Sequence, residues 1–279
     1  MRVLVLDEWL PYPLISGKRL RSYHLLTRAV RRHDITYLCF EDPAGEPEAK
    51  AHLEALGFRL VTLKRRDPFS SASRLLYRAG VNLLSPRPLV MRKHFRRDFA
   101  DRFLTLLNAE AFDLIHCEWT HYGAYVRNVR SHPLFLSSHN VETMPWERLC
   151  RHERDPLKKA LLYLEWKKMQ RFERQVCRYF HHAGAVSEQD GRQLRDVYGC
   201  DSVAVIPNGI DVAHYDFAFP ELARRTLVFS ASFDAFVNYD AAHYFLQAIL
   251  PRIVEHNSLV RILFLGKDPP QFLRKYAHR

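Results

Sequence analysis

One histidine of this sequence combines a reactive side chain with a position where such side chains often act. His139 follows the apolar stretch 134–136 and two serines, and it precedes Asn140 and Glu142. An imidazole titrates near neutral pH, and at the end of a strand it can hydrogen-bond a hydroxyl group or stabilise charge. The chain has 15 histidines, so position rather than residue type singles this one out. Glu142 either orients the imidazole or caps the helix that follows.

A basic loop near the N-terminus could face an anion. The sequence from Pro11 to Tyr23 follows the first apolar stretch and opens a helical pattern. Gly17 permits close approach to the backbone, and the first amides of a helix attract negative charge. Lys18, Arg19 and Arg21 add positive charge. The spacing matches neither the glycine pattern of dinucleotide-binding folds nor a P-loop, so an ordinary strand-to-helix turn is the alternative.

Two more polar turns lie between residues 186 and 211. Ser187 follows a short apolar strand and can cap the next helix. Asn208 and Gly209 follow a second strand and suit a turn that needs positive φ. In a parallel sheet both turns fall at the carboxyl ends of strands, where ligands bind. Ordinary cap and turn chemistry also explains these residues without a ligand.

Strand-like and helix-like segments alternate along the chain, which predicts a doubly wound, mostly parallel α/β fold. The first seven expected strands are residues 3–6, 35–40, 60–63, 112–117, 134–136, 183–186 and 203–206. A helical pattern runs from Leu20 to Val30. The longest helical pattern spans 145–181, and we expect it to be a helix that packs across the sheet.

We expect a domain boundary near Pro220, which divides the chain into residues 1–221 and 222–279. The second part contains expected strands at 227–231 and 260–265, with a helical pattern at 238–254 between them. A segment of this length cannot bury both faces of a parallel sheet by itself, because small units bury too little surface to offset chain entropy. The sequence therefore predicts one complete α/β domain followed by the incomplete start of a second.

Composition places the chain among ordinary globular proteins. Of its 279 residues 47% are hydrophobic and 26% are charged, and no apolar run approaches the length of a membrane span. The five cysteines are scattered without ligand spacing, which favours reduced thiols over a zinc site. The net charge of +11 attracts polyanions, namely nucleic acid, anionic lipid or phosphorylated small molecules.

A basic amphipathic stretch spans residues 64–102. It mixes eleven lysines and arginines with apolar and aromatic residues such as Phe69, Leu76 and Phe99. Such a segment either lies on an anionic membrane surface or forms a solvated helical face whose apolar side packs on the sheet.

The sequence motifs at these turns resemble those of glycosyltransferase family 4. Members of that family are nucleotide-sugar-dependent enzymes with two Rossmann-type domains in the GT-B arrangement. The resemblance rests on H-N-V-E at 139–142, V-S-E-Q-D at 186–190 and V-I-P-N-G-I-D at 205–211. It implies a GT-B-like fold, transfer of a hexose from a nucleotide sugar with retention, and no metal ion or other cofactor. The acceptor would be a glycan or a lipid-linked sugar in envelope polysaccharide or glycolipid synthesis.

The resemblance also assigns residues. His139 would contact the donor sugar near the reacting carbon, and Ser16-Gly17 stands where the family usually has a Gly-Gly pair facing the donor pyrophosphate. Lys18 or Arg19 would supply positive charge to that diphosphate. Further positions that match the family near its interdomain cleft are Ser187, Asp190, Asn208 and Gly209. Glu118 and His121, just past another strand end, face either the acceptor or the protein interior.

The second part of the chain departs from the family pattern in places. It reads Ser232-Phe233-Asp234, then Val237-Asn238, where one subgroup has Ser-Met-Asp and Pro-Asn. The family's glycine-rich loop and its two donor-holding glutamates lie beyond the region that this sequence matches. We therefore expect weak donor binding, and a companion chain would supply the rest of the nucleotide-binding domain.

Two alternatives belong to other functional classes. One is a catalytically silent subunit that binds an acceptor or a partner chain. The other is a nucleic-acid-binding protein. The charge allows it, but we disfavour it because the sequence has no helix-turn-helix, RNA-recognition or zinc-finger motif. We expect a cytoplasmic protein, in peripheral contact with the inner face of an anionic membrane if residues 64–102 bind lipid.

Overall fold

The computed structural model describes residues 1–42, 47–64, 82, 85–209, 211–214, 226–233, 236–274 and 276. The chain divides into two compact units, Met1–Asp211 and Val212–Arg279. The boundary expected between 221 and 222 lies outside the described residues, as does about half of the basic stretch 64–102, namely residues 65–81, 83 and 84. The two units are described separately below.

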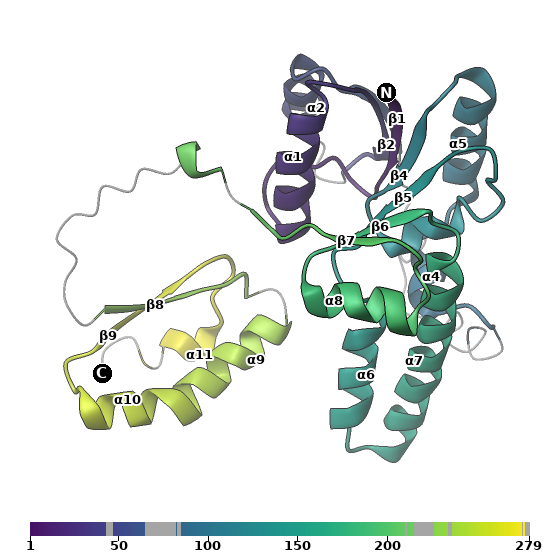
Figure 1. Ribbon diagram of the computed structural model, residues 1–279. Coiled ribbons are helices and arrows are strands. Elements are labelled where there is room, and N and C mark those ends of the chain that lie inside the picture. The colour runs from purple at the N-terminus through teal and green to yellow at the C-terminus, as the bar shows by residue number, and fades with distance from the viewer. Residues whose placement is uncertain are drawn as a thin grey trace. The chain divides into compact units, whose positions relative to one another are not determined.

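The first unit is built on a seven-stranded parallel sheet with the order β3-β2-β1-β4-β5-β6-β7 (Figure 1). The strands are β1 Arg2–Leu6, β2 Asp34–Phe40, β3 Arg59–Leu63, β4 Leu114–Cys117, β5 Leu134–Ser137, β6 His182–Ala185 and β7 Val203–Val205. All seven strands expected from the sequence are therefore confirmed. The order reverses beside β1, where Leu4 pairs with Thr36 on one side and Ile115 on the other.

Helices cover both faces of this sheet (Figure 1). Their bounds are α1 Gly17–Ala29, α2 Pro47–Ala55, α4 Leu89–His94, α5 Arg97–Ala109, α6 Thr143–His152, α7 Pro156–Cys177 and α8 Glu188–Arg192. A 3₁₀ turn, η1 (Thr120–Ala124), follows β4, and a π-helical turn, η2 (Gln193–Val197), continues α8.

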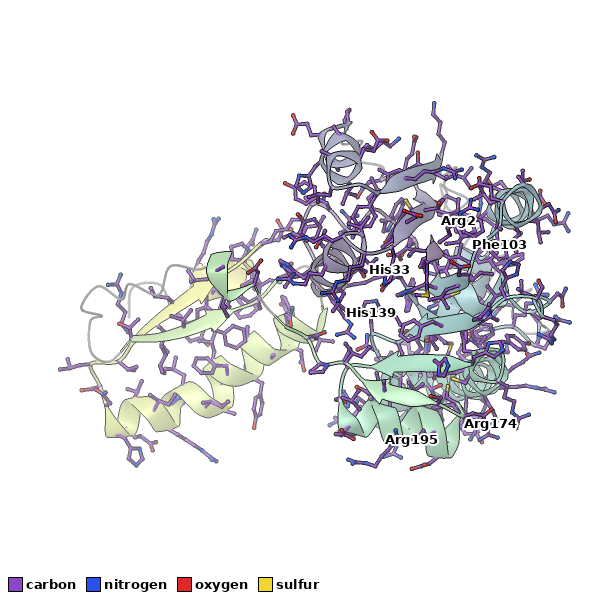
Figure 2. The ribbon with its side chains drawn as sticks, turned by 45° about the horizontal axis from the view of Figure 1, so that its top comes forward. Arg2, His33, Phe103, His139, Arg174 and Arg195 are labelled. Carbon is purple, nitrogen blue, oxygen red and sulfur yellow. The ribbon has the colours of Figure 1, made fainter. Side chains whose placement is uncertain are left out.

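Alternate residues of β1 supply two separate cores. Leu4 and Leu6 join the larger core, which includes Phe99 of α5 and Val176 of α7. Val3 and Val5 face the opposite way and join the core under α1 and α2. Figure 2 shows Phe103 of α5 pointing toward the sheet, where it contributes to the larger core. Because both faces of β1 are buried, its continuous apolar run is what a central parallel strand requires.

The long helical pattern at 145–181 is not one helix, and that expectation is wrong. The chain breaks between α6 and α7, which lie side by side (Figure 1). Asp155 caps α7 by accepting the Lys158 amide at 2.9 Å, and Pro156 occupies the first turn. Proline starts a helix well but disrupts a helix interior, so Asp155-Pro156 was the sequence signal for this break. The first half of α7 is also largely exposed, with Leu157 at 72%, rather than packed on the sheet.

The second unit contains a two-stranded parallel sheet, β8 (Thr226–Ser230) and β9 (Arg261–Leu265). The intervening helical segment runs through α9 (Phe236–Tyr244), the π turn η4 (Phe245–Ile249) and α10 (Leu250–His256). A 3₁₀ turn, η3 (Val212–His214), and a short helix, α11 (Gln271–Arg274), complete it. Asn238 donates to the Ser232 carbonyl at 2.7 Å. Two residues of the motifs that resemble the family subgroup are therefore bonded to one another locally.

Within the described part of the chain, no helix is both long enough and apolar enough to cross a membrane. All five cysteines are buried and free, so none forms a disulfide.

Candidate active site

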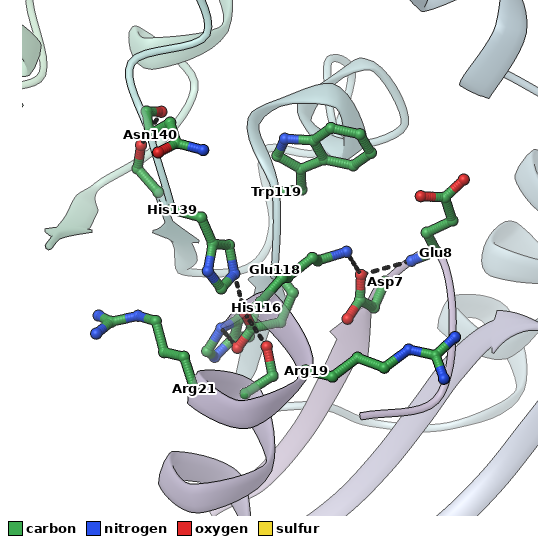
Figure 3. Close-up of polar contacts among 12 residues, drawn as sticks. Asp7, Glu8, Arg19, Arg21, His116, Glu118, Trp119, His139 and Asn140 are labelled. Atoms are coloured by element: carbon green, nitrogen blue, oxygen red, sulfur yellow. Dashed lines mark hydrogen bonds and ion pairs between the residues drawn. The ribbon is translucent and has the colours of Figure 1, made fainter. Parts of the chain in front are cut away.

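Polar side chains from several strands gather at the carboxyl edge of the first unit's sheet. His139 follows β5, Glu118 follows β4 and Asp7 follows β1 (Figures 2 and 3). Helix α1 begins at the same edge and adds its basic first turns. This edge is where open parallel α/β sheets bind ligands, and the strand order reverses here between β1 and β4.

A buried carboxylate lies at the centre of this cluster. Glu118 is 1% exposed, and its Oε2 accepts hydrogen bonds from His139 Nε2 at 2.8 Å and from Ser22 Oγ at 2.9 Å (Figure 3). His116 Nε2 lies 3.0 Å from Oε1, an ion-pair distance without an aligned hydrogen bond. Burial raises the pKa of the Glu118 carboxyl, but His116 and His139 outweigh burial and hold that pKa well below its usual range. Glu118 is therefore an ionised carboxylate inside the protein.

The cationic side chains of the α1 loop are paired inside the protein. Lys18 Nζ forms an ion pair with Asp7, whose other oxygen accepts from Tyr37 at 2.6 Å. Arg19 pairs with Asp42 at the end of β2. The two cations proposed to hold a diphosphate are thus each neutralised by a carboxylate.

Arg21 and Asn208 contact one another across the edge. The Arg21 guanidinium, which is buried, donates to Asn208 Oδ1 at 3.0 Å. Nearby, Arg28 pairs with Asp211 at 3.3 Å, so two arginines of α1 hold the segment after β7. Asn208 therefore lies at the same edge as His139, as its position after a strand predicted.

The start of α1 remains the anion-attracting feature of the loop. Ser16 caps the helix by accepting the Arg19 amide at 3.3 Å. A helix leaves its first amides without intrahelical partners, which here are those of Gly17 and Lys18. A Cβ added at Gly17 would meet nothing within 4 Å, so the space beside the Gly17 Cα is open.

Glu142 neither caps α6 nor orients His139, so both interpretations of this residue are wrong. Its carboxylate accepts the Trp119 indole N–H at 2.7 Å. The helix is capped instead by Glu173 of α7, which accepts the amides of Glu142 and Thr143 at 2.9 and 3.0 Å. Burial raises the pKa of Glu142 to about 7, assisted by the neighbouring Glu173 charge and opposed by the Trp119 hydrogen bond.

A second imidazole cluster lies beside this site, and sequence reasoning did not identify His94 as part of it. His94 Nδ1 is 3.2 Å from Glu8 Oε1, and its ring is 5.4 Å from that of His121. The rings of His121 and Trp119 are in contact but tilted, with centroids 4.0 Å apart and an interplanar angle of 60°. Neither His121 ring nitrogen has a hydrogen-bond partner among the described residues. Burial lowers the pKa of His121 to about 3, so this ring is neutral. His121 was expected to face either the acceptor or the protein interior, and its burial favours the interior.

The remaining predicted positions behave as local structure. Ser187 caps α8 by accepting the Asp190 amide at 3.1 Å, as expected. Neither Asn208 nor Gly209 adopts a left-handed backbone conformation, so the positive-φ turn expected after β7 is wrong. Whether Ser187 and Gly209 contact a substrate stays a prediction. Among the described residues, no three His, Cys, Asp or Glu side chains are grouped in a way that could hold a metal ion.

Comparisons with known proteins bear on the family and the fold of the chain. The family model for Glycosyltransferase Family 4 matches residues 17–214. A structure of HepE from Anabaena, in complex with UDP and glucose, aligns with 95% of this chain and 69% of its own, at TM-score 0.50 and 17% identity. A structure of UGT89C1 from Arabidopsis thaliana, complexed with UDP-L-rhamnose, aligns with 97% of this chain and 70% of its own, at TM-score 0.46 and 12% identity. No curated protein sequence matches the chain.

The chain belongs to glycosyltransferase family 4, because the family model covers more than half of it. Its fold is that of the GT-B glycosyltransferases, with which it shares the parallel α/β architecture.

Proposed function

We propose that this protein transfers a hexose from a nucleotide sugar to a glycan or lipid-linked acceptor, with retention and without a metal ion. The observation that carries the proposal is the Glu118–His139 pair at the carboxyl edge of the sheet in a family 4 chain. The HepE structure with UDP and glucose supports a nucleotide-sugar donor for the same fold. We place the product among envelope polysaccharides or glycolipids.

His139 contacts the donor sugar in this proposal. Its imidazole is held at the edge by Glu118, and its side chain keeps 9% of its surface accessible. A fixed polar group next to the reacting carbon stabilises the charge that develops as the diphosphate leaves.

The α1 N-terminus takes the diphosphate. Because Lys18 and Arg19 are paired with Asp7 and Asp42, backbone amides supply the attraction. Amides at a helix start bind phosphate well, and the open space at Gly17 allows the approach. Ser16 caps the helix and thereby holds its first turn in place at the site.

A transfer assay tests the proposal. UDP- and GDP-sugars are incubated with the full chain and candidate acceptors, and both released nucleotide and the anomeric configuration of the product are measured. We expect His139→Ala to lower the rate by about 100-fold or more, a usual size for loss of a polar contact to the transition state. His182→Ala, at the amino end of β6 and exposed, is the matched control. Equal rates for the two variants would remove His139 from the site.

Peripheral contact with an anionic membrane on the cytoplasmic side is part of this proposal. It rests on the basic stretch 64–102, about half of which lies outside the described residues. Each Lys or Arg near such a surface contributes about 1 kcal/mol, and the attraction decays within a Debye length. We expect the protein to sediment with phosphatidylglycerol vesicles at low salt and to be released at high salt. If the protein does not sediment at low salt, the stretch is instead a helical face that packs on the sheet.

A second candidate is a catalytically silent subunit that binds an acceptor or a companion chain. The exposed apolar residues of β8 and β9 favour it, because exposed apolar strands recruit other chains. Light scattering, which gives the oligomeric state, and the transfer assay together decide between the candidates. A monomer that transfers sugar supports the enzyme. An inactive chain that gains activity with a companion supports the subunit.

A further inference from the structure

We infer that Glu118 is a positioning residue that fixes the ring orientation and the tautomer of His139, so that Nδ1 is the ring atom presented to the substrate. The substrate half of this inference rests on the proposed function. The half that concerns the ring rests on the contact between His139 and Glu118 and on the charge of Glu118.

Three elements converge on the Glu118 carboxylate. Ser22 reaches it from α1, His139 from the end of β5, and His116 from β4 itself. The carboxylate is anchored in turn by its own backbone, since the Glu118 amide donates to the Leu6 carbonyl at 3.0 Å. Figure 3 shows His116 and His139 beside the Glu118 carboxylate. Glu118 therefore cannot rotate away without leaving a buried charge unpaired, which is strongly unfavourable.

The direction of the His139 hydrogen bond follows from this charge. An ionised carboxylate has only acceptor oxygens, so the nitrogen that contacts it must carry a hydrogen. That nitrogen is Nε2, at 2.8 Å from Oε2. In the neutral imidazole the other nitrogen, Nδ1, then holds a lone pair and accepts hydrogen bonds.

This assignment makes His139 selective for a particular kind of partner. A ring that offers an acceptor recognises a hydroxyl group, and a sugar analogue that lacks that hydroxyl leaves Nδ1 unpaired. A site built to bond a hydroxyl rejects the deoxy analogue much more strongly than an apolar pocket rejects a shape change. Glu118 thus acts on specificity without touching the substrate.

Nuclear magnetic resonance of the ¹⁵N-labelled full chain tests the inference without any substrate. The His139 ring signals are assigned by their loss in His139→Gln, and the chemical shifts of its two nitrogens report the tautomer. We expect the Nε2–H form to make up about 90% or more of neutral His139. A ring that is mainly protonated at Nδ1 would overturn the inference.

Variants separate positioning from general support of the fold. Glu118→Gln should raise the Nδ1–H fraction several-fold, because the amide N–H₂ group can donate to Nε2 where the carboxylate could not. Ser22→Ala removes a different donor from the same carboxylate and should leave the tautomer unchanged. An unchanged ratio in Glu118→Gln would also overturn the inference, and so would an equal shift in Ser22→Ala. These ratios decide the role of Glu118, whereas the transfer assay above decides the function, so the two can fail separately.

Discussion

The strands of the two units look alike in sequence and differ in burial. β1 and β9 both have five residues with apolar runs that end in leucine. In the first unit Leu6 is fully buried, whereas in the second Leu265 is 50% exposed and Val228 of β8 is 58% exposed. β1 has a strand on each side and helices on both faces, while β8 and β9 have only one another among the described strands. A continuous apolar run therefore indicates a parallel strand, but its burial depends on its neighbours.

The largest expected contrast is in hydrogen exchange. Amides of β1 and β4 should exchange at least about 100-fold more slowly than those of β8 and β9, because well-packed central strands open only with global unfolding. Mass spectrometry after timed exposure to deuterated water measures this. Similar protection in both units would show that the second unit is as well packed as the first.

A matched pair of leucines tests the same contrast by mutation. Leu6→Ala should lower the free energy of unfolding of the first unit by about 2–5 kcal/mol, as expected for a fully buried leucine. Leu265→Ala, at the last residue of β9, should change the stability of its unit by less than about 1 kcal/mol. Chemical denaturation of both variants provides the measurement, and equal losses would contradict the burial difference.

His121 extends the comparison within the first unit, because burial of this side chain should lower the stability of a well-packed region at acidic pH. Its folded pKa of about 3 is below the usual 6.5, so between these values the unfolded chain binds more protons and stability falls as the pH drops. His121→Phe removes this effect and should gain about 2 kcal/mol at pH 5 relative to pH 7.5. The same change at the exposed His182 is the control. If the gain is equal at both pH values, the buried neutral ring is not its source.

Glu142 should give an effect of similar size and opposite sign. Burial raises its pKa from 4.5 to about 7, so the folded state binds more protons in that range and stability falls as the pH rises. Glu142→Gln should flatten this part of the stability profile by roughly 1–3 kcal/mol, because the Trp119 hydrogen bond can persist. Denaturation at pH 5 and pH 8 measures the slope; an unchanged slope would mean that Glu142 is ionised throughout.

The sequence predicted the strands well, because apolar runs of strand length bounded by polar turns leave few alternatives. It also predicted which turns would share one edge, since parallel strands bring their carboxyl ends together, and Glu118 and His139 do meet there. The sequence could not predict which charged side chains form contacts with which partners, because the partners are far apart in the chain. Examples are Lys18 with Asp7, Arg19 with Asp42, and Glu173 with the start of α6. The break at Asp155-Pro156 was readable, and the long apolar periodicity across it obscured the signal.

The central claim is that His139, held by Glu118 at the edge of the first unit's sheet, contacts the donor sugar. Calorimetric titration of the full chain with UDP- and GDP-sugars, beside His139→Ala and His182→Ala, tests it most directly. We predict weak binding to one of these donors, a loss of about tenfold or more in affinity for His139→Ala, and no change for His182→Ala. Affinities that agree for all three proteins, or no binding of any donor, would contradict the account.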